Sequence, residues 1–418
     1  MKNVRFVFTL LSCLALSGAA YAVEQSKPHD MSKMWQKSLA SKQLSTSALF
    51  DKHGTLWLAQ VQEGHVLVSH SADQGKSFSE AVKVNPQQEA IAASGETRPK
   101  ILLAENGNIY ISYTQSLDMP FAGNIRFSRS LDGGKHFTEP ITVNDNLDLI
   151  THRFEAMGIN RRGEIYLAWL DKRDAVVAKN KGETYSGIAV YYAVSDNEGK
   201  SFKPNIKVAD HTCECCRIAM AIDNDDTPVI VWRHIFGKNT RDHALARLDG
   251  KQSLLTALPT PQRVTFQNWE VDACPHHGPS LSISERIYHL TWFNHATEGG
   301  ALFYAHSSDG GKTFSAPIAV GNSSQQAGHA TVLSNGKKVY LAWKEFDGEV
   351  TSIKAMRSAD GGETWGAAEK IADTRDLSDH PLLIANQDQV YLSWSTLLEG
   401  YRLIALPVEQ LSMMDQQR

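Results

Sequence analysis

Five short segments with one shared turn pattern restrict the fold of this 418-residue chain more than any other feature. Each reads Ser-x-Asp-x-Gly-x-x-aromatic, with Asn197 in place of the aspartate in the third: "SADQGKSF" from Ser71, "SLDGGKHF" from Ser130, "SDNEGKSF" from Ser195, "SSDGGKTF" from Ser307 and "SADGGETW" from Ser358. In such a turn the carboxylate caps backbone N–H groups and glycine supplies a positive φ. Successive third residues are 59, 65, 112 and 51 positions apart, so one unit of the repeat lacks its turn.

Apolar, strand-like runs repeat with the same spacing and identify the missing unit. The runs are "LWLAQ" at Leu56, "IYISY" at Ile109, "IYLAW" at Ile165, "VIVW" at Val229, "IYHLTW" at Ile287, "VYLAW" at Val339 and "VYLSW" at Val390. Units of about four short strands, with no convincing amphipathic helix, predict an all-β fold of the β-propeller type. Seven blades are expected, and six blades with an appendage are the alternative.

The domain organisation follows from the repeat. One propeller domain is expected over residues 45–410, with blades beginning near residues 45, 97, 152, 216, 277, 327 and 379. The last unit offers three strands. A strand from the N-terminal segment 23–44, around "MWQKSLA", is expected to complete it.

The first 22 residues have the features of a secretory signal peptide. Lys2 and Arg5 precede the apolar stretch "FVFTLLSCLALSGAA", and Ala20-Tyr21-Ala22 fits a small-x-small cleavage site. No later apolar run approaches the roughly 18 residues of a membrane-spanning helix. We therefore expect export to the periplasm, with no membrane span.

The formal net charge is -4, and it becomes -6 once residues 1–22 are removed with their two basic side chains. Such a balance provides no basic surface for nucleic acid or for an anionic membrane. It leaves the oligomeric state open.

Cysteine is rare in the chain, yet "HTCECCRIAM" contains Cys213, Cys215 and Cys216 within four residues. Cys13 lies in the signal peptide, so Cys274 is the only other cysteine of the exported chain. In an oxidising compartment four cysteines most often form two disulfides.

Aligning the units on their strands predicts which residues surround one mouth of the central channel, because the inner strand of each blade runs along the propeller axis. The residues that precede these strands are Ser45, Arg98, Arg153, Cys216 with Arg217, His276 with His277, His329, and His380. "DACPHHGPS" also carries Cys274 to this rim. The rim thus combines arginines, thiols and imidazoles.

Two interpretations of the cysteines remain open. Two disulfides, for instance Cys213–Cys216 and Cys215–Cys274, would stabilise long loops by about 2–4 kcal/mol. Alternatively, the thiols bind a soft metal, copper or else zinc, with His276, His277, His329 and His380 as further ligands. Thiolate-rich ligation favours Cu(I).

The five turns are Asp boxes, and together with the strand repeat they resemble the sialidase (neuraminidase) superfamily over roughly residues 45–405. The resemblance implies three arginines that grip a sugar carboxylate, a tyrosine nucleophile paired with a glutamate, and an aspartate acid/base. Arg98 in "TRPKI" resembles the first arginine, with Arg153 and Arg217 as candidates for the others. Tyr401 and Glu399 are near each other in the last unit, but no Tyr/Glu pair falls on the rim. Fold alone does not settle activity.

Three functions are therefore compatible with the sequence. The first is a periplasmic metalloprotein whose Cys/His site takes copper and either binds the metal or uses it in redox chemistry. The second is an exo-α-sialidase-type glycoside hydrolase, and the third is a non-catalytic, disulfide-braced scaffold. Each takes its ligand at the channel mouth, whether a metal ion, a small molecule or a glycan.

Overall fold

The computed structural model describes residues 44–249, 258, 261–273, 275–296 and 301–407. Within these ranges nearly all of the regular secondary structure consists of antiparallel strands, so the predicted all-β class is confirmed. The expected signal peptide at 1–22 and the strand expected around "MWQKSLA" lie outside the described residues.

The N-terminal half forms three antiparallel groups of strands. The first group is β1 (Ser47–Phe50), β2 (Leu56–Gln62), β3 (His65–Ser71) and β4 (Val82–Lys83). The second is β5 (Ile91–Ala92), β6 (Lys100–Leu103), β7 (Ile109–Ser116), β8 (Gly123–Ser130) and β9 (Ile141–Thr142). The third is β10 (His152–Ile159), β11 (Ile165–Asp171), β12 (Ile188–Ser195) and β13 (Ile206–Thr212).

The C-terminal half continues the pattern. Its groups are β14 (Ala219–Ile222), β15 (Pro228–Phe236), β16 (Thr240–Arg247) and β17 (Gln262–Arg263); β18 (Ser280–Ser284), β19 (Ile287–Asn294), β20 (Ala301–Ser307) and β21 (Ile318–Val320); β22 (Gly328–Asn335), β23 (Lys338–Phe346), β24 (Thr351–Ser358) and β25 (Glu369–Thr374); and β26 (Leu382–Asn386), β27 (Gln389–Thr396) and β28 (Gly400–Ala405). One residue pair, Thr212 with His234, joins the groups of β10–β13 and β14–β17 into an eight-stranded sheet.

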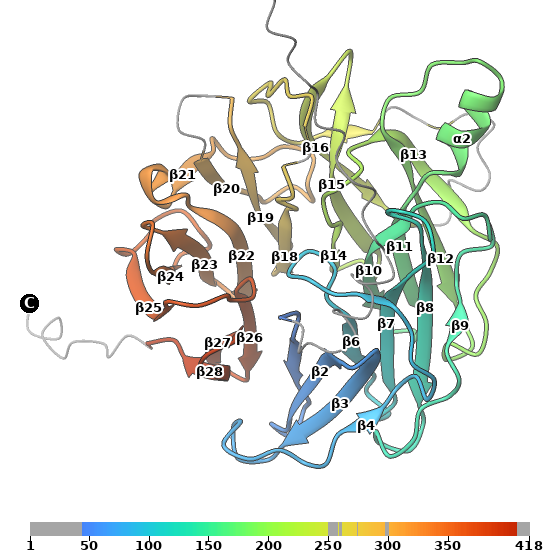
Figure 1. The fold of residues 1–418 in the computed structure, drawn as a ribbon. Coiled ribbons are helices and arrows are strands. Elements are labelled where there is room, and N and C mark those ends of the chain that lie inside the picture. The colour runs from blue at the N-terminus through green and yellow to red at the C-terminus, as the bar shows by residue number, and fades with distance from the viewer. Residues whose placement is uncertain (1–43, 250–257, 259–260, 274, 297–300, 408–418) are drawn as a thin grey trace, which may run out of the picture.

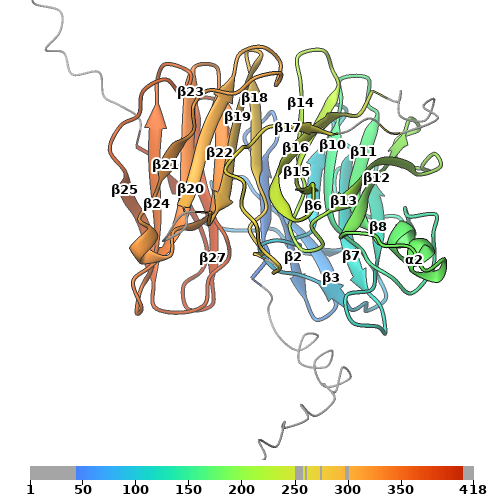
Figure 2. The same cartoon turned by 90° about the horizontal axis from the view of Figure 1, so that it is seen from above.

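The first strands of the groups contact one another in a circle. β1 contacts β6, and the contacts continue through β10, β14, β18, β22 and β26 back to β1. Figure 1 shows these strands around a common centre, and Figure 2 shows the sheets side by side along one axis. The loops that precede the first strands therefore meet at one end of that centre.

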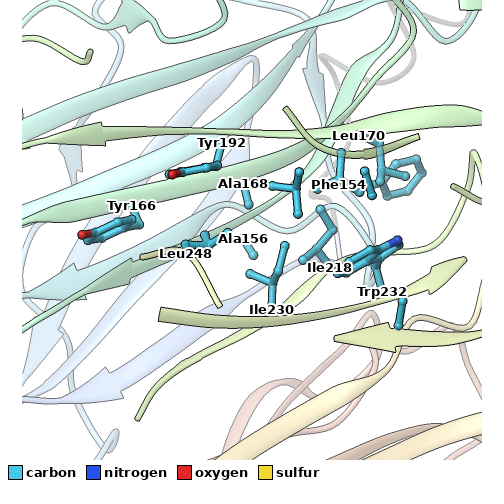
Figure 3. Packing of buried hydrophobic residues seen from close by; sticks show 14 of the residues in the cluster. Phe154, Ala156, Tyr166, Ala168, Leu170, Tyr192, Ile218, Ile230, Trp232 and Leu248 are labelled. Atoms are coloured by element: carbon cyan, nitrogen blue, oxygen red, sulfur yellow. The ribbon is translucent and has the colours of Figure 1, made fainter. Parts of the chain in front are cut away.

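Hydrophobic cores lie between neighbouring sheets, because each sheet is apolar on both faces. In the core shown in Figure 3, Phe154, Ala168 and Leu170 of one group pack with Ile230 and Trp232 of the next. All seven residues of β11 are buried, as expected of a central strand that is covered on both faces.

The Asp-box turns have the hydrogen bonds that the sequence predicts. In the box at Asp132 the Ser130 hydroxyl donates to Oδ1, and Oδ1 accepts the His136 N–H at 3.0 Å. Gly134 has a φ of 84°, and a Cβ there would lie 2.8 Å from the Trp57 ring. Only glycine satisfies both conditions.

One helix departs from the expectation that the chain lacks helices. Helix α2 (Arg173–Asn180) connects β11 and β12 at the periphery, and a 3-10 turn, η2 (Ser323–Gln325), precedes β22. Ala178 is the only buried residue of α2. The helix has no apolar face, and so its sequence carries no helical periodicity that could have revealed it.

Among the described residues, no helix combines the length and the apolar character that crossing a lipid bilayer requires.

Candidate functional site

A cavity of about 280 Å³ lies where the first strands converge. Its lining includes a residue from each of them: Ala48, Lys100, Met157, Met220, Leu281, Thr331 and Leu382. Gly95, Arg98, Arg217 and His380, from the preceding loops, also line it. Arg98, Arg217 and His380, which the alignment of the repeats places on one rim, line this cavity together.

The three cysteines of "HTCECCRIAM" form a compact group in the loop between β13 and β14. The Sγ atoms of Cys213, Cys215 and Cys216 all lie within 4.8 Å of one another, and those of Cys213 and Cys215 are 3.7 Å apart. The exposed fractions are 0%, 5% and 1%. The Cys213 N–H donates to the Arg233 carbonyl at 3.0 Å, which ties the loop to β15.

These three thiols are free, so the predicted Cys213–Cys216 disulfide is absent from the described chain. The alternative pairing of Cys215 with Cys274 cannot be placed, because residue 274 lies outside the described residues. The local reason for the free thiols is geometric: the loop directs all three sulfurs to one point instead of aligning one pair.

Two arginines place positive charge at the thiol group. Arg241 Nη1 donates to Cys213 Sγ at 3.3 Å, and Arg233 is almost fully buried beside it. Interactions with the neighbouring thiols, together with these arginine charges, hold the pKa of Cys213 well below its usual value. The Cys213 sulfur in turn raises the pKa values of Cys215 and Cys216. The group is therefore arranged to stabilise one thiolate.

A second group lies at the same mouth and contains Glu96, His329 and His380. Glu96 Oε1 is 3.4 Å from His329 Nδ1 and 3.5 Å from His380 Nδ1. Arg217 Nη1 donates to Oε1 at 2.5 Å, and the Gly278 N–H donates to Oε2 at 3.1 Å. Burial raises the pKa of the Glu96 carboxyl, but the Arg217 charge and the two histidines outweigh burial and lower it overall.

The histidines of this group belong to a stack of rings. Ring centroids are 3.5 Å apart for His329 and His380 and 4.2 Å apart for His277 and His329, and Phe293 stacks on His277 at 4.2 Å. Burial, the largest cause in each case, lowers the pKa of His329, His380 and His277, the last to about 3. The imidazoles are therefore neutral near pH 7 and can act as ligands.

Glycine makes room for the stack. A Cβ at Gly95 would lie 2.2 Å from His380 Nδ1, and a Cβ at Gly328 would lie 2.7 Å from His277 Cε1. The backbone before β6 and at the start of β22 can approach the rings only because these side chains are missing.

The thiols and the histidines thus form two groups instead of the single site suggested by the sequence. Arg233 lies between them, since its carbonyl accepts from Cys213 while its Nη2 donates to the His277 carbonyl at 3.1 Å. His276 is exposed and belongs to neither group. His277 reaches the second group only by stacking.

The candidate arginines mostly form hydrogen bonds, ion pairs or ring contacts with other residues of the protein. Arg98 donates to the Thr46 carbonyl at 2.8 Å, to Asp379 Oδ1 at 3.1 Å and to the His380 carbonyl at 3.1 Å. Arg217 is paired with Glu96. The Arg153 guanidinium lies 5.3 Å from the Phe154 ring centroid, and its buried Nε has no hydrogen-bond partner.

The tyrosine and glutamate near the C-terminus are not directed at these arginines. Tyr401 packs edge-on against Phe78, and Glu399 accepts hydrogen bonds from Thr374 and Thr396. Two residues that lie at this site, Asp379 and Glu96, were not among the site residues predicted from the sequence. A signal was present, since Glu96 precedes Arg98 in "GETRPK" and Asp379 precedes His380.

No family model matches the chain, and no curated protein matches it. Among solved structures, an ulvan lyase described as a new family of polysaccharide lyase is 9% identical, with a TM-score of 0.53 over 89% of this chain and 95% of that one. The polysaccharide lyase Uly1 is 10% identical, with a TM-score of 0.52 over 88% and 89%. A NanB sialidase variant from Streptococcus pneumoniae is 9% identical, with a TM-score of 0.46 over 87% and 91%. The lyases show that the all-β fold is similar to that of propeller-type enzymes.

Proposed function

We propose that the chain is an exported, periplasmic propeller protein of seven blades that binds Cu(I) through Cys213, Cys215 and Cys216. The blade number is supported by the circle of contacts between the first strands. The metal site is supported by one observation above all, the convergence of three buried, free thiols on one point.

The spacing of the sulfurs suits a metal ion. A metal–sulfur bond of about 2.3 Å places the sulfurs of a tetrahedral or trigonal site about 3.8–4.0 Å apart. Cys213 and Cys215 are already 3.7 Å apart. A metal ion could therefore bind with little movement of the loop.

The charge balance favours Cu(I) over Zn²⁺. Three thiolates with Cu(I) carry a net charge of -2, and Arg233 and Arg241 beside the group carry two positive charges. Buried charge is tolerated only where such compensation exists, and thiolates are the ligands that select Cu(I). Zinc remains the alternative metal. The protein would hold the ion for transfer or for redox chemistry.

Copper binding should depend on each of the three thiols. We expect about one Cu(I) per chain for protein loaded anaerobically against a Cu(I) chelator, measured by mass spectrometry of the metal. Cys213→Ser and Cys216→Ser should each weaken binding by more than about 100-fold, since even the loss of an outer partner of a ligand costs 10–100-fold.

Met220→Leu is the matched control, because it removes a sulfur from β14 outside the thiol group. It should leave the copper content unchanged. If metal-free protein purified anaerobically has no free thiols, the cysteines form structural disulfides instead of a metal site.

A sialidase reaction is not expected from this arrangement. The Arg98 guanidinium donates hydrogen bonds to two carbonyls and Asp379, and Tyr401 packs on Phe78. We predict no release of sialic acid from a chromogenic α-sialoside above the blank rate. Turnover that disappears in both Arg98→Ala and Tyr401→Phe would overturn this ranking of functions. The ulvan lyase likeness, which includes a structure bound to -[GlcA(1-4)Rha3S]-, supports the fold without supporting a substrate.

A further inference from the structure

We infer that the cavity of about 280 Å³ between the first strands, here called the channel cavity, binds a small monocarboxylate. The carboxylate would lie at Lys100, and the apolar chain of the ligand would extend along the channel. The charge near the mouth and the apolar walls beyond it define this class of ligand. The site requires neither a metal ion nor the proposed copper site.

Lys100 lines the channel cavity and, among the described residues, has no carboxylate partner. The other two lining cations are paired. Arg98 pairs with Asp379. Arg217 pairs with Glu96. Lys100 Nζ donates to the Arg98 carbonyl, and the described part of the chain offers it no ion pair. Since an ammonium group has three N–H donors, two remain for a ligand. A partly buried positive charge is tolerated when a counter-charge lies beside it, and the carboxylate of a ligand would supply one.

The walls of the channel cavity become apolar away from the mouth. Lys100 is the first residue of β6, and Leu102 follows on the same strand. Met157 of β10, Met220 of β14 and Leu281 of β18 line the cavity from other strands. A sugar acid would leave hydroxyl groups without partners against these side chains, which costs free energy. A short hydrocarbon chain would bury apolar surface there instead.

The volume of the channel cavity limits the length of the ligand. Sites for drug-sized molecules occupy about 300–1,000 Å³, and this cavity holds about 280 Å³. A carboxylate with a chain of a few carbon atoms, such as butyrate, is therefore the best match.

The charge of Lys100 should change within an accessible pH range. Burial is the largest cause that lowers the pKa of Lys100 to about 8. The positive charges of Arg98 and Arg217 act in the same direction. The carboxylates of Glu155 and Glu96 oppose the shift. Because the ammonium form attracts a carboxylate and the neutral amine does not, binding should be constant between about pH 6 and 7 and weaken about 10-fold for each pH unit above 8.

Calorimetry of butyrate binding to the full chain tests the proposal, with butyramide as a neutral molecule of nearly the same shape. At constant ionic strength and pH 7, butyrate should bind at least about 10-fold more tightly than butyramide, since hydrogen bonds to charged groups contribute about 1.5–3 kcal/mol. The affinity for butyrate should follow the pH profile described above.

Three variants assign the effect to Lys100. Lys100→Met keeps the length of the side chain without its charge, so it should weaken butyrate binding at least about 10-fold at pH 7 and remove the decline above pH 8. Lys100→Arg should retain binding and also lose the decline, because arginine stays charged. Lys52→Met is the control. Lys52 Nζ also donates to a backbone carbonyl, that of Glu105, but it is exposed, so this change should alter neither the affinity nor the profile.

The proposal is overturned if butyrate and butyramide bind equally, if neither binds, or if Lys100→Met keeps both the affinity and the pH profile of its parent. If circular dichroism shows that Lys100→Met does not fold, Lys100→Gln takes its place under the same criterion. Lys100→Met should load Cu(I) as its parent does, so failure of the carboxylate site can be told from failure of the copper site.

Discussion

Replacing Arg98 by alanine is expected to lower the free energy of unfolding by about 3–5 kcal/mol, because the change leaves a buried carboxylate without its opposing charge. Asp379 is 2% exposed, and Arg98 is the arginine that pairs with it. Arg98 also donates to the carbonyls of Thr46 and His380. It therefore joins the loops that precede β1, β6 and β26, where the first and last groups of strands meet. Urea denaturation followed by tryptophan fluorescence would measure the loss.

Arg375→Ala is the control for this prediction. Arg375 and Glu349 form an ion pair on the surface, with side chains 69% and 70% exposed. Exposed pairs contribute about 0–1 kcal/mol. If Arg98→Ala destabilised the protein no more than Arg375→Ala, the structural role of Arg98 would be refuted, and its side chain would again be a candidate for binding an anion.

The loss in Arg98→Ala should depend on pH. Burial raises the pKa of Asp379 even with Arg98 present, and removal of Arg98 should raise it further. A carboxyl whose folded pKa exceeds its unfolded value, about 3.9, destabilises the fold as the pH rises from the unfolded to the folded pKa. The difference between Arg98→Ala and the parent should therefore narrow as the pH approaches 4. An unchanged difference between pH 4 and pH 7 would contradict the buried-charge explanation.

Replacing Trp343 by alanine should cost about 3–5 kcal/mol of stability, as large-to-small changes at buried aromatic residues do. Trp343 is 1% exposed, and its Nε1 donates to Glu345 Oε1 at 2.8 Å. Trp343→Phe keeps most of the ring and loses this hydrogen bond, so a loss of about 1–3 kcal/mol is expected. Chemical denaturation of the two variants would separate packing from hydrogen bonding.

Phe266→Ala provides the comparison, since Phe266 is 66% exposed. It should change stability by less than about 0.5 kcal/mol. A Trp343→Ala protein as stable as its parent would mean that the strand-end tryptophans serve some purpose other than packing, such as a platform for sugars.

Much of the fold could be predicted because its signals are local. The turn at Asp132 needs only its own serine, aspartate and glycine, and β11 needs only its own apolar run. The convergence of Cys213, Cys215 and Cys216 is also local, since four successive residues cannot separate far. Helix α2 was missed because its exposed residues follow no apolar period.

The sequence by itself determined the all-β class and the turns, because both rest on patterns in the local sequence, and it grouped Arg98, Arg217 and His380, which line one cavity. Only the tertiary structure decided which of those residues meet. Glu96 reaches His329 across 233 positions, and Arg98 reaches Asp379 across 281. Such pairings depend on how far each blade is rotated about the axis and how deep each loop lies. These quantities are set by packing between sheets, and no local pattern records them.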